Sequence, residues 1–266
     1  MVVERVTSAD GTILAYESTG DGPPLILVGG AFCGRSASAS GTPLAALLAH
    51  RFTVLSYDRR GRGDSTDSPT YAIEREVEDL AALIAAAGGS AYVFGNSSGG
   101  LLALDAVVAG LPIEELALYE PPVILDPGRS QAFEVLASKL DEAVAEGRRG
   151  EAVELYFTQV VQMLAPAVAQ MRQAPMWPGL EAIAHTLSYD LRITARGAAR
   201  LERLSSVRVA TLVLDGSASA PWMRDAIRVL AQALPTSNHQ TLVGQTHAVD
   251  IGVLARALEA LGDCSR

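Results

Sequence analysis

The chain has 266 residues, of which 49% are hydrophobic and 5% aromatic, and its formal net charge is −9. This length and apolar content suffice for one globular domain with a sizeable core, with room for an inserted subdomain. The acidic balance argues against nucleic acid or an anionic membrane surface as a partner.

The sequence shows few features of a secreted, membrane-bound or disulfide-bonded protein. The first residues, MVVERVTSADG, contain an early glutamate and no long apolar run, so we expect no signal peptide. No uninterrupted apolar stretch reaches the roughly 18 residues that a membrane helix needs. The two cysteines, Cys33 and Cys264, are too few for a disulfide framework. The expectation is a cytoplasmic protein without a membrane partner.

Short strands are predicted for the first 60 residues. The stretches VVERVTS and TILAYEST flank Ala-Asp-Gly, a hairpin signal. LILVGG is a continuous apolar run, typical of a strand that is buried on both faces. TPLAALLAH then has helical periodicity, and FTVLSYD predicts a second buried strand.

Strand and helix then alternate. IEREVEDLAALIAAAG predicts a helix with Val77, Leu80, Leu83 and Ile84 on one face and Gly88-Gly89 at its end. AYVFG predicts a strand, GGLLALDAVVAG a helix and LALYE a further strand. Alternation at this spacing favours βαβ units and therefore an α/β fold with a mostly parallel, doubly wound sheet.

Residues 126–204 interrupt this alternation. Helical spacing of apolar residues recurs through them, beginning with Phe133, Leu136, Leu140 and Val144, and no strand pattern appears. We expect an all-helical cap there, inserted into a core of residues 1–125 and 205–266. The alternation resumes with VATLVLDG, the helix WMRDAIRVLAQALP, the strand HQTLVG and a last helix, LARALEALG.

The stretch Gly95-Asn96-Ser97-Ser98-Gly99 follows a predicted strand directly and opens a predicted helix. That is the setting of a G-x-S-x-G nucleophile elbow, which presents a serine at a helix N-terminus, where negative charge is favoured. A phosphate loop would need a Gly-Lys-Ser/Thr ending and a dinucleotide site a G-x-G-x-x-G pattern, and neither occurs here. We therefore expect Ser97 to be a nucleophile.

With this elbow, nearly the whole chain resembles the α/β-hydrolase family. LILVGGAFCG is similar to the family's strand and loop that supply half of an oxyanion hole, and SYDRRGRGDS is similar to its Asp-x-Arg-Gly-x-Gly-x-Ser segment. The first stretch departs from the family in carrying Gly29-Gly30 where many members carry His-Gly. The resemblance implies that the backbone N–H of Ala31, or alternatively of Phe32, forms the hole together with that of Ser98.

The same resemblance implies a catalytic histidine in a loop after the last strand, and His247 in TLVGQTHAVD has that place. Of the other three histidines, His50 ends a predicted helix and His239 begins a predicted strand. His185 falls in the cap, where a surface or structural role is favoured over a place in the pocket.

The acid departs from the common family pattern. Many members carry an aspartate a few residues after the strand that matches VATLVLDG, but Ser219 stands there in this chain. The resemblance also implies an alternative acid position at the end of the strand that follows the elbow helix. Glu120, which ends LALYE, has that place and is our choice, with Asp215 as the alternative. Asp250 fits a helix N-cap better. The expected relay is Glu120–His247–Ser97.

Apolar side chains of the cap and of the core loops are candidates for a substrate pocket, although each taken alone fits core packing better. They are Phe32, Tyr156, Phe157, Met163, Met171, Met176, Trp177 and Trp222. Cys33 fits a small buried side chain better than a reactive thiol. No His, Cys or Asp cluster has metal-ligand spacing, so no metal or cofactor is expected.

The function expected is that of a serine hydrolase, acting on an ester, lactone or thioester of a small, largely apolar molecule through an acyl-enzyme. Peroxide-forming members and C–C bond hydrolases also use serine and stay open. One alternative is a non-hydrolytic cyclase, lyase or acyl-transfer enzyme of a biosynthetic pathway, since fold does not decide function. The other is a ligand-binding protein that has lost catalysis, against which the presence of both Ser97 and His247 argues.

Overall fold

The computed structural model describes residues 2–262, apart from the side chain of Ala198, and over this range its strands form one eight-stranded sheet. The strands are β1 (Glu4–Thr7), β2 (Ile13–Thr19), β3 (Pro24–Val28), β4 (Thr53–Tyr57), β5 (Ala91–Asn96), β6 (Ile113–Tyr119), β7 (Ala210–Gly216) and β8 (Ser237–Leu242). Their order in the sheet is β1-β2-β4-β3-β5-β6-β7-β8. Cys264 lies outside the described residues.

Two pairings at one edge of the sheet are antiparallel, β1 with β2 and β2 with β4. The first is the hairpin predicted from the sequence. The remaining pairings, from β4 through β3, β5, β6 and β7 to β8, are parallel. The fold is therefore α/β with a mostly parallel sheet, as predicted.

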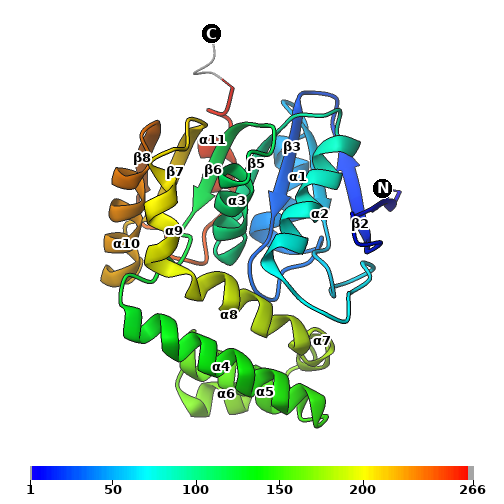
Figure 1. Ribbon diagram of the computed structural model, residues 1–266, viewed down its shortest axis with the longest axis vertical. Helices are drawn as coiled ribbons and strands as arrows, with labels where there is room; N and C mark the ends of the chain where they lie inside the picture. Colours follow the sequence, from blue (N-terminus) through cyan, green and yellow to red (C-terminus); the bar gives the residue numbers. More distant parts are fainter. Residues whose placement is uncertain (1, 263–266) are drawn as a thin grey trace.

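Helices cover both faces of this sheet (Figure 1). On one face lie α2 (Ile73–Ala86), α3 (Ser98–Val108) and α10 (Pro221–Ala233). On the other lie α1 (Thr42–Leu48), preceded by the 3-10 helix η1 (Ser38–Ser40), and α11 (Ile251–Leu258). Strand β3 shows why both faces are apolar, since Ile26 packs into the first of these cores and Leu27 into the second.

The chain between β6 and β7 is helical. It forms α4 (Pro127–Ala145), α5 (Arg149–Gln159), α6 (Ala165–Met171), α7 (Trp177–Ala182), the 3-10 helix η2 (Ala184–Thr186), α8 (Leu187–Ala195) and α9 (Gly197–Leu204). In Figure 1 α4, α5 and α6 lie below the sheet, and α8 runs between them and the core. The helices α4 to α8 share an apolar core of their own, whereas α9 also contacts α3 and α10. We propose residues 126–204 as a cap unit on this basis.

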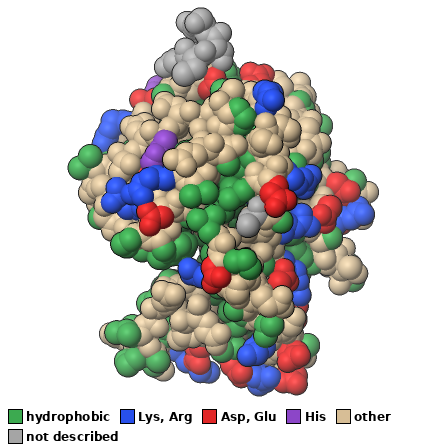
Figure 2. Space-filling model, turned by 60° about the vertical axis from the view of Figure 1, so that its left-hand side comes forward, with side chains coloured by type: hydrophobic (Ala, Val, Ile, Leu, Met, Phe, Trp, Pro, Cys, Tyr) green, Lys and Arg blue, Asp and Glu red, His purple; other side chains and the backbone are tan. Residues whose placement is uncertain are grey.

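The cap leaves a recess at the surface. Figure 2 shows a hollow between the larger upper part of the molecule and its smaller lower part, with hydrophobic side chains gathered beside it. None of the helices over residues 2–262 combines the length and the apolar composition that crossing a membrane requires.

Candidate active site

Ser97 lies at the sharp turn between β5, which ends at Asn96, and α3, which begins at Ser98. Its backbone has φ 55° and ψ −129°, a region that costs a non-glycine residue about 1–3 kcal/mol. The turn is closed by close packing of strand on helix, because a Cβ on Gly95 would lie 2.4 Å from the Cα of Gly100, and one on Gly99 2.3 Å from the carbonyl oxygen of Val28. The glycines of the motif thus permit the approach that holds Ser97 in this conformation.

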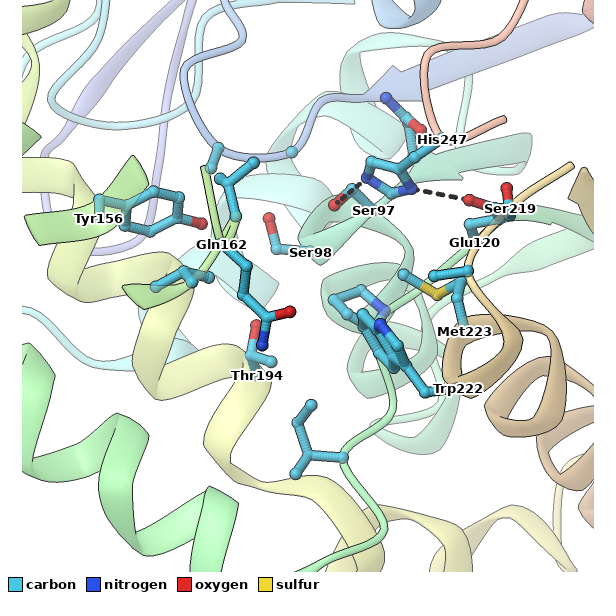
Figure 3. A pocket seen from close by; sticks show the side chains of 18 of the residues that line it. Ser97, Ser98, Glu120, Tyr156, Gln162, Thr194, Ser219, Trp222, Met223 and His247 are labelled. Carbon is cyan, nitrogen blue, oxygen red and sulfur yellow. Dashed lines mark hydrogen bonds and ion pairs between the residues drawn. The ribbon is translucent and has the colours of Figure 1, made fainter. Parts of the chain in front are cut away.

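A hydrogen-bonded chain leads from Ser97 to a buried carboxylate (Figure 3). The Oγ of Ser97 lies 3.2 Å from Nε2 of His247, and Nδ1 of His247 lies 2.8 Å from Oε2 of Glu120. The carboxylate of Glu120 is fully buried, and its other oxygen, Oε1, accepts the backbone N–H of Gly216 at 2.8 Å. With both carboxylate oxygens engaged by donors, the imidazole can carry its proton on Nδ1 and turn the lone pair of Nε2 toward Ser97.

The loop that carries His247 is tied to the ends of two strands. The hydroxyl of Tyr119 donates to the carbonyl oxygen of Thr246 at 2.5 Å, and the N–H of Ala218 donates to that of Gln245 at 2.9 Å. Asp250 begins α11, and its Oδ1 accepts the N–H of Val253 at 2.9 Å, so the predicted N-cap is confirmed. These bonds fix the loop on both sides of the histidine.

Asp215, the alternative acid, is engaged elsewhere. Its Oδ1 accepts the hydroxyl proton of Thr241 at 2.6 Å and lies 3.1 Å from Nε2 of His239, while Oδ2 lies 3.4 Å from Nε of Arg224. Ser219, at the position where many relatives carry the acid, borders the same cavity as Ser97. The structure therefore brings Glu120 to His247 and directs Asp215 toward β8 and α10.

The loop after β3 runs directly against the nucleophile. A Cβ on Gly30 would lie 2.8 Å from the Cβ of Ser97, so the glycine is required for this approach. The next two residues, Ala31 and Phe32, donate their backbone N–H to no acceptor within the described part of the chain. Ser98 is the first residue of α3, and its N–H has no acceptor within that helix. All three border the cavity at Ser97.

A buried charged cluster, which the sequence analysis did not anticipate, holds this loop and the elbow together. Asp190, on cap helix α8, accepts from the hydroxyl of Ser98 at 2.6 Å, from Arg59 at 2.7 Å and from Arg62 at 2.5 Å. Burial by itself raises the pKa of Asp190, but the charges of Arg62 and Arg59 outweigh it and leave that pKa below its ordinary value.

The same two arginines reach the loop after β3. The guanidinium of Arg62 donates to the carbonyl oxygen of Gly30 at 2.6 Å, and that of Arg59 donates to Gly29 at 3.2 Å. Both belong to the segment SYDRRGRGDS. Their place directly after a buried strand was the sequence signal that could have indicated a role near the site, because the carboxyl ends of parallel strands meet at one edge of the sheet. The aspartate that pairs with them comes from the distant cap.

Ser97 and His247 open into a cavity of about 550 Å³ between core and cap. Figure 3 shows Tyr156, Gln162 and Thr194 of the cap on one side of it and Trp222 and Met223 of the core on the other. Its wall is mainly apolar. Other side chains of this wall that the sequence analysis did not single out are Ile124, Arg129, Phe133, Val160 and Val161.

The predicted pocket residues divide into two groups. Phe32, Tyr156 and Trp222 do border the cavity. Met176 and Trp177 do not, which corrects the prediction, because Met176 is exposed and Trp177 packs in the core of the cap. Phe157, Met163 and Met171 also pack against the cap core instead of bordering the cavity.

His185 and Cys33 are two further residues that the sequence analysis considered. His185 is half buried beside Asp67 and Arg149, where burial lowers its pKa, and does not border the cavity. Cys33 borders the cavity and is partly exposed, so the prediction of a buried side chain is corrected. Over residues 2–262 no group of three or more His, Cys, Asp or Glu side chains is placed to hold a metal ion.

The chain is similar to known proteins over nearly its whole length. The model of the alpha/beta hydrolase family matches residues 25–257. The crystal structure of an alpha/beta hydrolase from Sphaerobacter thermophilus DSM 20745 is 49% identical, with a TM-score of 0.85 over 96% of this chain and 98% of that chain.

More distant structures share the fold. They include the esterase RhEst1 from Rhodococcus sp. ECU1013 (22% identical, TM-score 0.69) and the enol-lactonase from Burkholderia xenovorans LB400 (24%, 0.67), each over 98% of both chains. A curated relative, an uncharacterised hydrolase named YraK from Bacillus subtilis (strain 168), is 28% identical over 149 residues. That match spans about half of the relative, 54% of its length.

Proposed function

The chain belongs to the alpha/beta hydrolase family, and we propose that it is a serine hydrolase that cleaves an ester, lactone or thioester of a small, largely apolar substrate. Family membership and the hydrolases among its relatives support hydrolase activity in general. The observation that carries the finer proposal is the continuous chain from Ser97 through His247 to the buried Glu120, opening into a cavity.

In the first half of the reaction, the Oγ of Ser97 attacks the substrate carbonyl while Nε2 of His247 takes its proton. The imidazolium that forms keeps its Nδ1–H on Oε2 of Glu120, 2.8 Å away, and that carboxylate stabilises the positive charge. His247 then gives its proton to the leaving alcohol or thiol, and Ser97 carries the acyl group.

The negative charge on the substrate oxygen needs donors in place before the reaction begins. We assign this role to the backbone N–H of Ser98 together with that of Ala31 or Phe32, since these groups border the cavity beside the nucleophile. Preorganised donors of this kind contribute several kcal/mol to transition-state stabilisation. The contacts of Asp190 with Ser98 and the two arginines would hold the donors in position.

The exposure of His247 supports hydrolysis over the non-hydrolytic alternatives. In the second half of the reaction, water attacks the acyl carbonyl while Nε2 of His247 takes its proton, and that proton then passes to the Oγ of Ser97 as the acid is released. The side chain of His247 is 48% exposed, so a water molecule can approach the acyl-enzyme beside the histidine that must deprotonate it. A cyclase or acyl-transfer enzyme would instead need to keep water away at this stage.

A fluorophosphonate probe tests the proposal, read by mass spectrometry of the intact protein and of its peptides. We expect one label on Ser97 and hydrolysis of p-nitrophenyl butyrate, both lost in Ser97→Ala. The matched control is Ser138→Ala, at an exposed hydroxyl on α4 that bonds only the carbonyl of Glu134, and it should label as the wild type does. A wild-type protein that neither takes the label nor hydrolyses the ester would refute the proposal.

A further inference from the structure

The cavity wall carries one uncompensated charge. Of the residues that border the cavity, Glu120 is the only Asp or Glu, and Arg129 and His247 are the only Arg, Lys or His; Glu120 and His247 bond each other. Arg129, on the first turn of α4, is partly exposed, and within residues 2–262 no carboxylate lies at ion-pair distance from its guanidinium. A cation without a counter-ion in a mainly apolar wall calls for an explanation.

The guanidinium of Arg129 is nevertheless held in place. Its Cζ lies 4.5 Å from the centre of the Trp222 ring and 5.5 Å from that of Phe133. The cation–π attraction to these two rings restricts the side chain but uses the face of the guanidinium and leaves the N–H groups on its edge available.

The nearest carboxylate along the chain, Asp126, is already used. Its Oδ1 accepts the backbone N–H of Gly128 at 3.1 Å, and its Oδ2 accepts that of Arg129 at 3.2 Å. Asp126 is thus the N-cap of α4 and stabilises the start of that helix. Its two oxygens point to the backbone, and the guanidinium of the same turn stays without an anion.

We propose that Arg129 binds a carboxylate on the substrate, so that the substrate is an ester, lactone or thioester with a small apolar body and one anionic carboxylate. This inference rests on the hydrolase function proposed above. A guanidinium edge matches a carboxylate with two parallel N–H···O bonds, and the apolar wall strengthens that attraction. A phosphate dianion fits less well, because a single cation would neutralise only part of its charge.

Two further observations agree with this assignment. The protein as a whole carries a net charge of −9, which disfavours an approaching anion, and a cation at the cavity attracts an anionic substrate locally. Trp222, over which the guanidinium lies, stands below the Ser97–His247 pair in Figure 3. The carboxylate would therefore lie away from the carbonyl that reacts, at the other end of the apolar body.

The kinetic test uses a matched pair of substrates, mono-p-nitrophenyl glutarate and its neutral methyl ester. We expect Arg129→Gln to lower kcat/KM for the anionic ester by about 10- to 100-fold, the range for a hydrogen-bonded charge. The neutral ester should lose little, and Arg129→Lys should recover part of the preference. The control is Arg148→Gln, which makes the same charge change at an exposed arginine paired with Glu146 and Glu151.

A binding test decides the site without catalysis. Monomethyl succinate, glutarate and adipate are titrated by calorimetry into Ser97→Ala, and binding of at least one should weaken on adding Arg129→Gln but not Arg148→Gln. If none of the three binds, or if Arg129→Gln changes neither this binding nor the substrate preference, the carboxylate site is wrong. One outcome separates the two proposals. If the wild-type protein takes no label on Ser97 and hydrolyses no ester, but binds a carboxylate in a way that depends on Arg129, the hydrolase proposal is wrong and the carboxylate-site proposal stands.

Discussion

Exchanging Glu120 for glutamine tests which carboxylate supports His247. In the wild-type protein both carboxylate oxygens face donors, Nδ1–H of His247 at 2.8 Å and the backbone N–H of Gly216 at 2.8 Å. A glutamine amide has only one acceptor end, so its NH₂ group must face either Gly216 or the imidazole. Facing the imidazole, it selects the tautomer with the proton on Nε2, which cannot accept the proton of Ser97.

The expected magnitude follows from these contacts. The loss of the correct tautomer and of the charge that stabilises the imidazolium should lower kcat by about 10,000-fold, or about 5 kcal/mol in activation free energy. The mismatched donor pair in a fully buried site should also lower the free energy of unfolding by about 1–3 kcal/mol. Asp215→Asn is the matched control, because Asp215 is equally buried but bonds Thr241, His239 and Arg224.

The assay is steady-state hydrolysis of p-nitrophenyl butyrate, with thermal unfolding of each variant measured in parallel. Asp215→Asn should lose stability and keep kcat within a few-fold of the wild type. Glu120→Gln should lose kcat while it remains folded at the assay temperature. If Glu120→Gln turns over close to the wild-type rate while a folded Asp215→Asn is inactive, the assignment of the acid is wrong and Asp215 takes the role.

Further predictions concern the packing around the site. Asp190→Asn leaves two buried arginines without their shared anion and should lower the free energy of unfolding by about 3–5 kcal/mol; an unchanged denaturant melt would contradict this. Burial raises the pKa of Asp190, but the arginines more than offset it and hold that pKa below its ordinary 3.8. The contribution of Asp190 is then complete above about pH 5, begins to decline near the ordinary pKa of the unfolded chain, and is lost as the pH falls through the lowered value. The stabilities of wild type and Asp190→Asn should therefore converge only as the pH falls below about 4. Gly99→Ala, whose Cβ would lie 2.3 Å from the oxygen of Val28, should destabilise the protein and slow labelling of Ser97. Gly179→Ala, on helix α7 with no atom within 4 Å of the added carbon, should be neutral or stabilising by up to about 1 kcal/mol; equal effects of the two alanines would count against the elbow argument.

Most of the elements could be predicted because their signals are local. The run LILV predicted a strand buried on both faces, and β3 places Ile26 and Leu27 in opposite cores. The spacing of Leu80, Leu83 and Ile84 predicted the inner face of α2, and all three are buried there. The order of the strands was not predicted, because the partner of a strand is set by long-range packing and not by the strand's own periodicity.

The pocket shows where helical periodicity stops being informative. A cap helix has more than one apolar face in reach of packing partners, and spacing does not say which face meets the cavity. Trp177 was expected there, yet it packs inside the cap, and its indole Nε1–H donates to Glu181 at 2.8 Å. The sequence analysis did not single out Arg129, whose guanidinium lies over Trp222 at the cavity wall.

The sequence by itself predicted the elbow, and its resemblance to the α/β-hydrolase family narrowed the expected acid to two carboxylates at neighbouring strand ends, Glu120 and Asp215. Only the tertiary structure decided which of them meets His247. Asp215 lies within β7, where its register opposite Thr241 of β8 directs its side chain along that pair of strands. Glu120 follows the last residue of β6 with φ 44°, and this turn carries its carboxylate across to Gly216 and His247. A side chain's direction at a strand end depends on backbone angles and on neighbours from distant segments, so the chain order could place both carboxylates near the site but could not orient them.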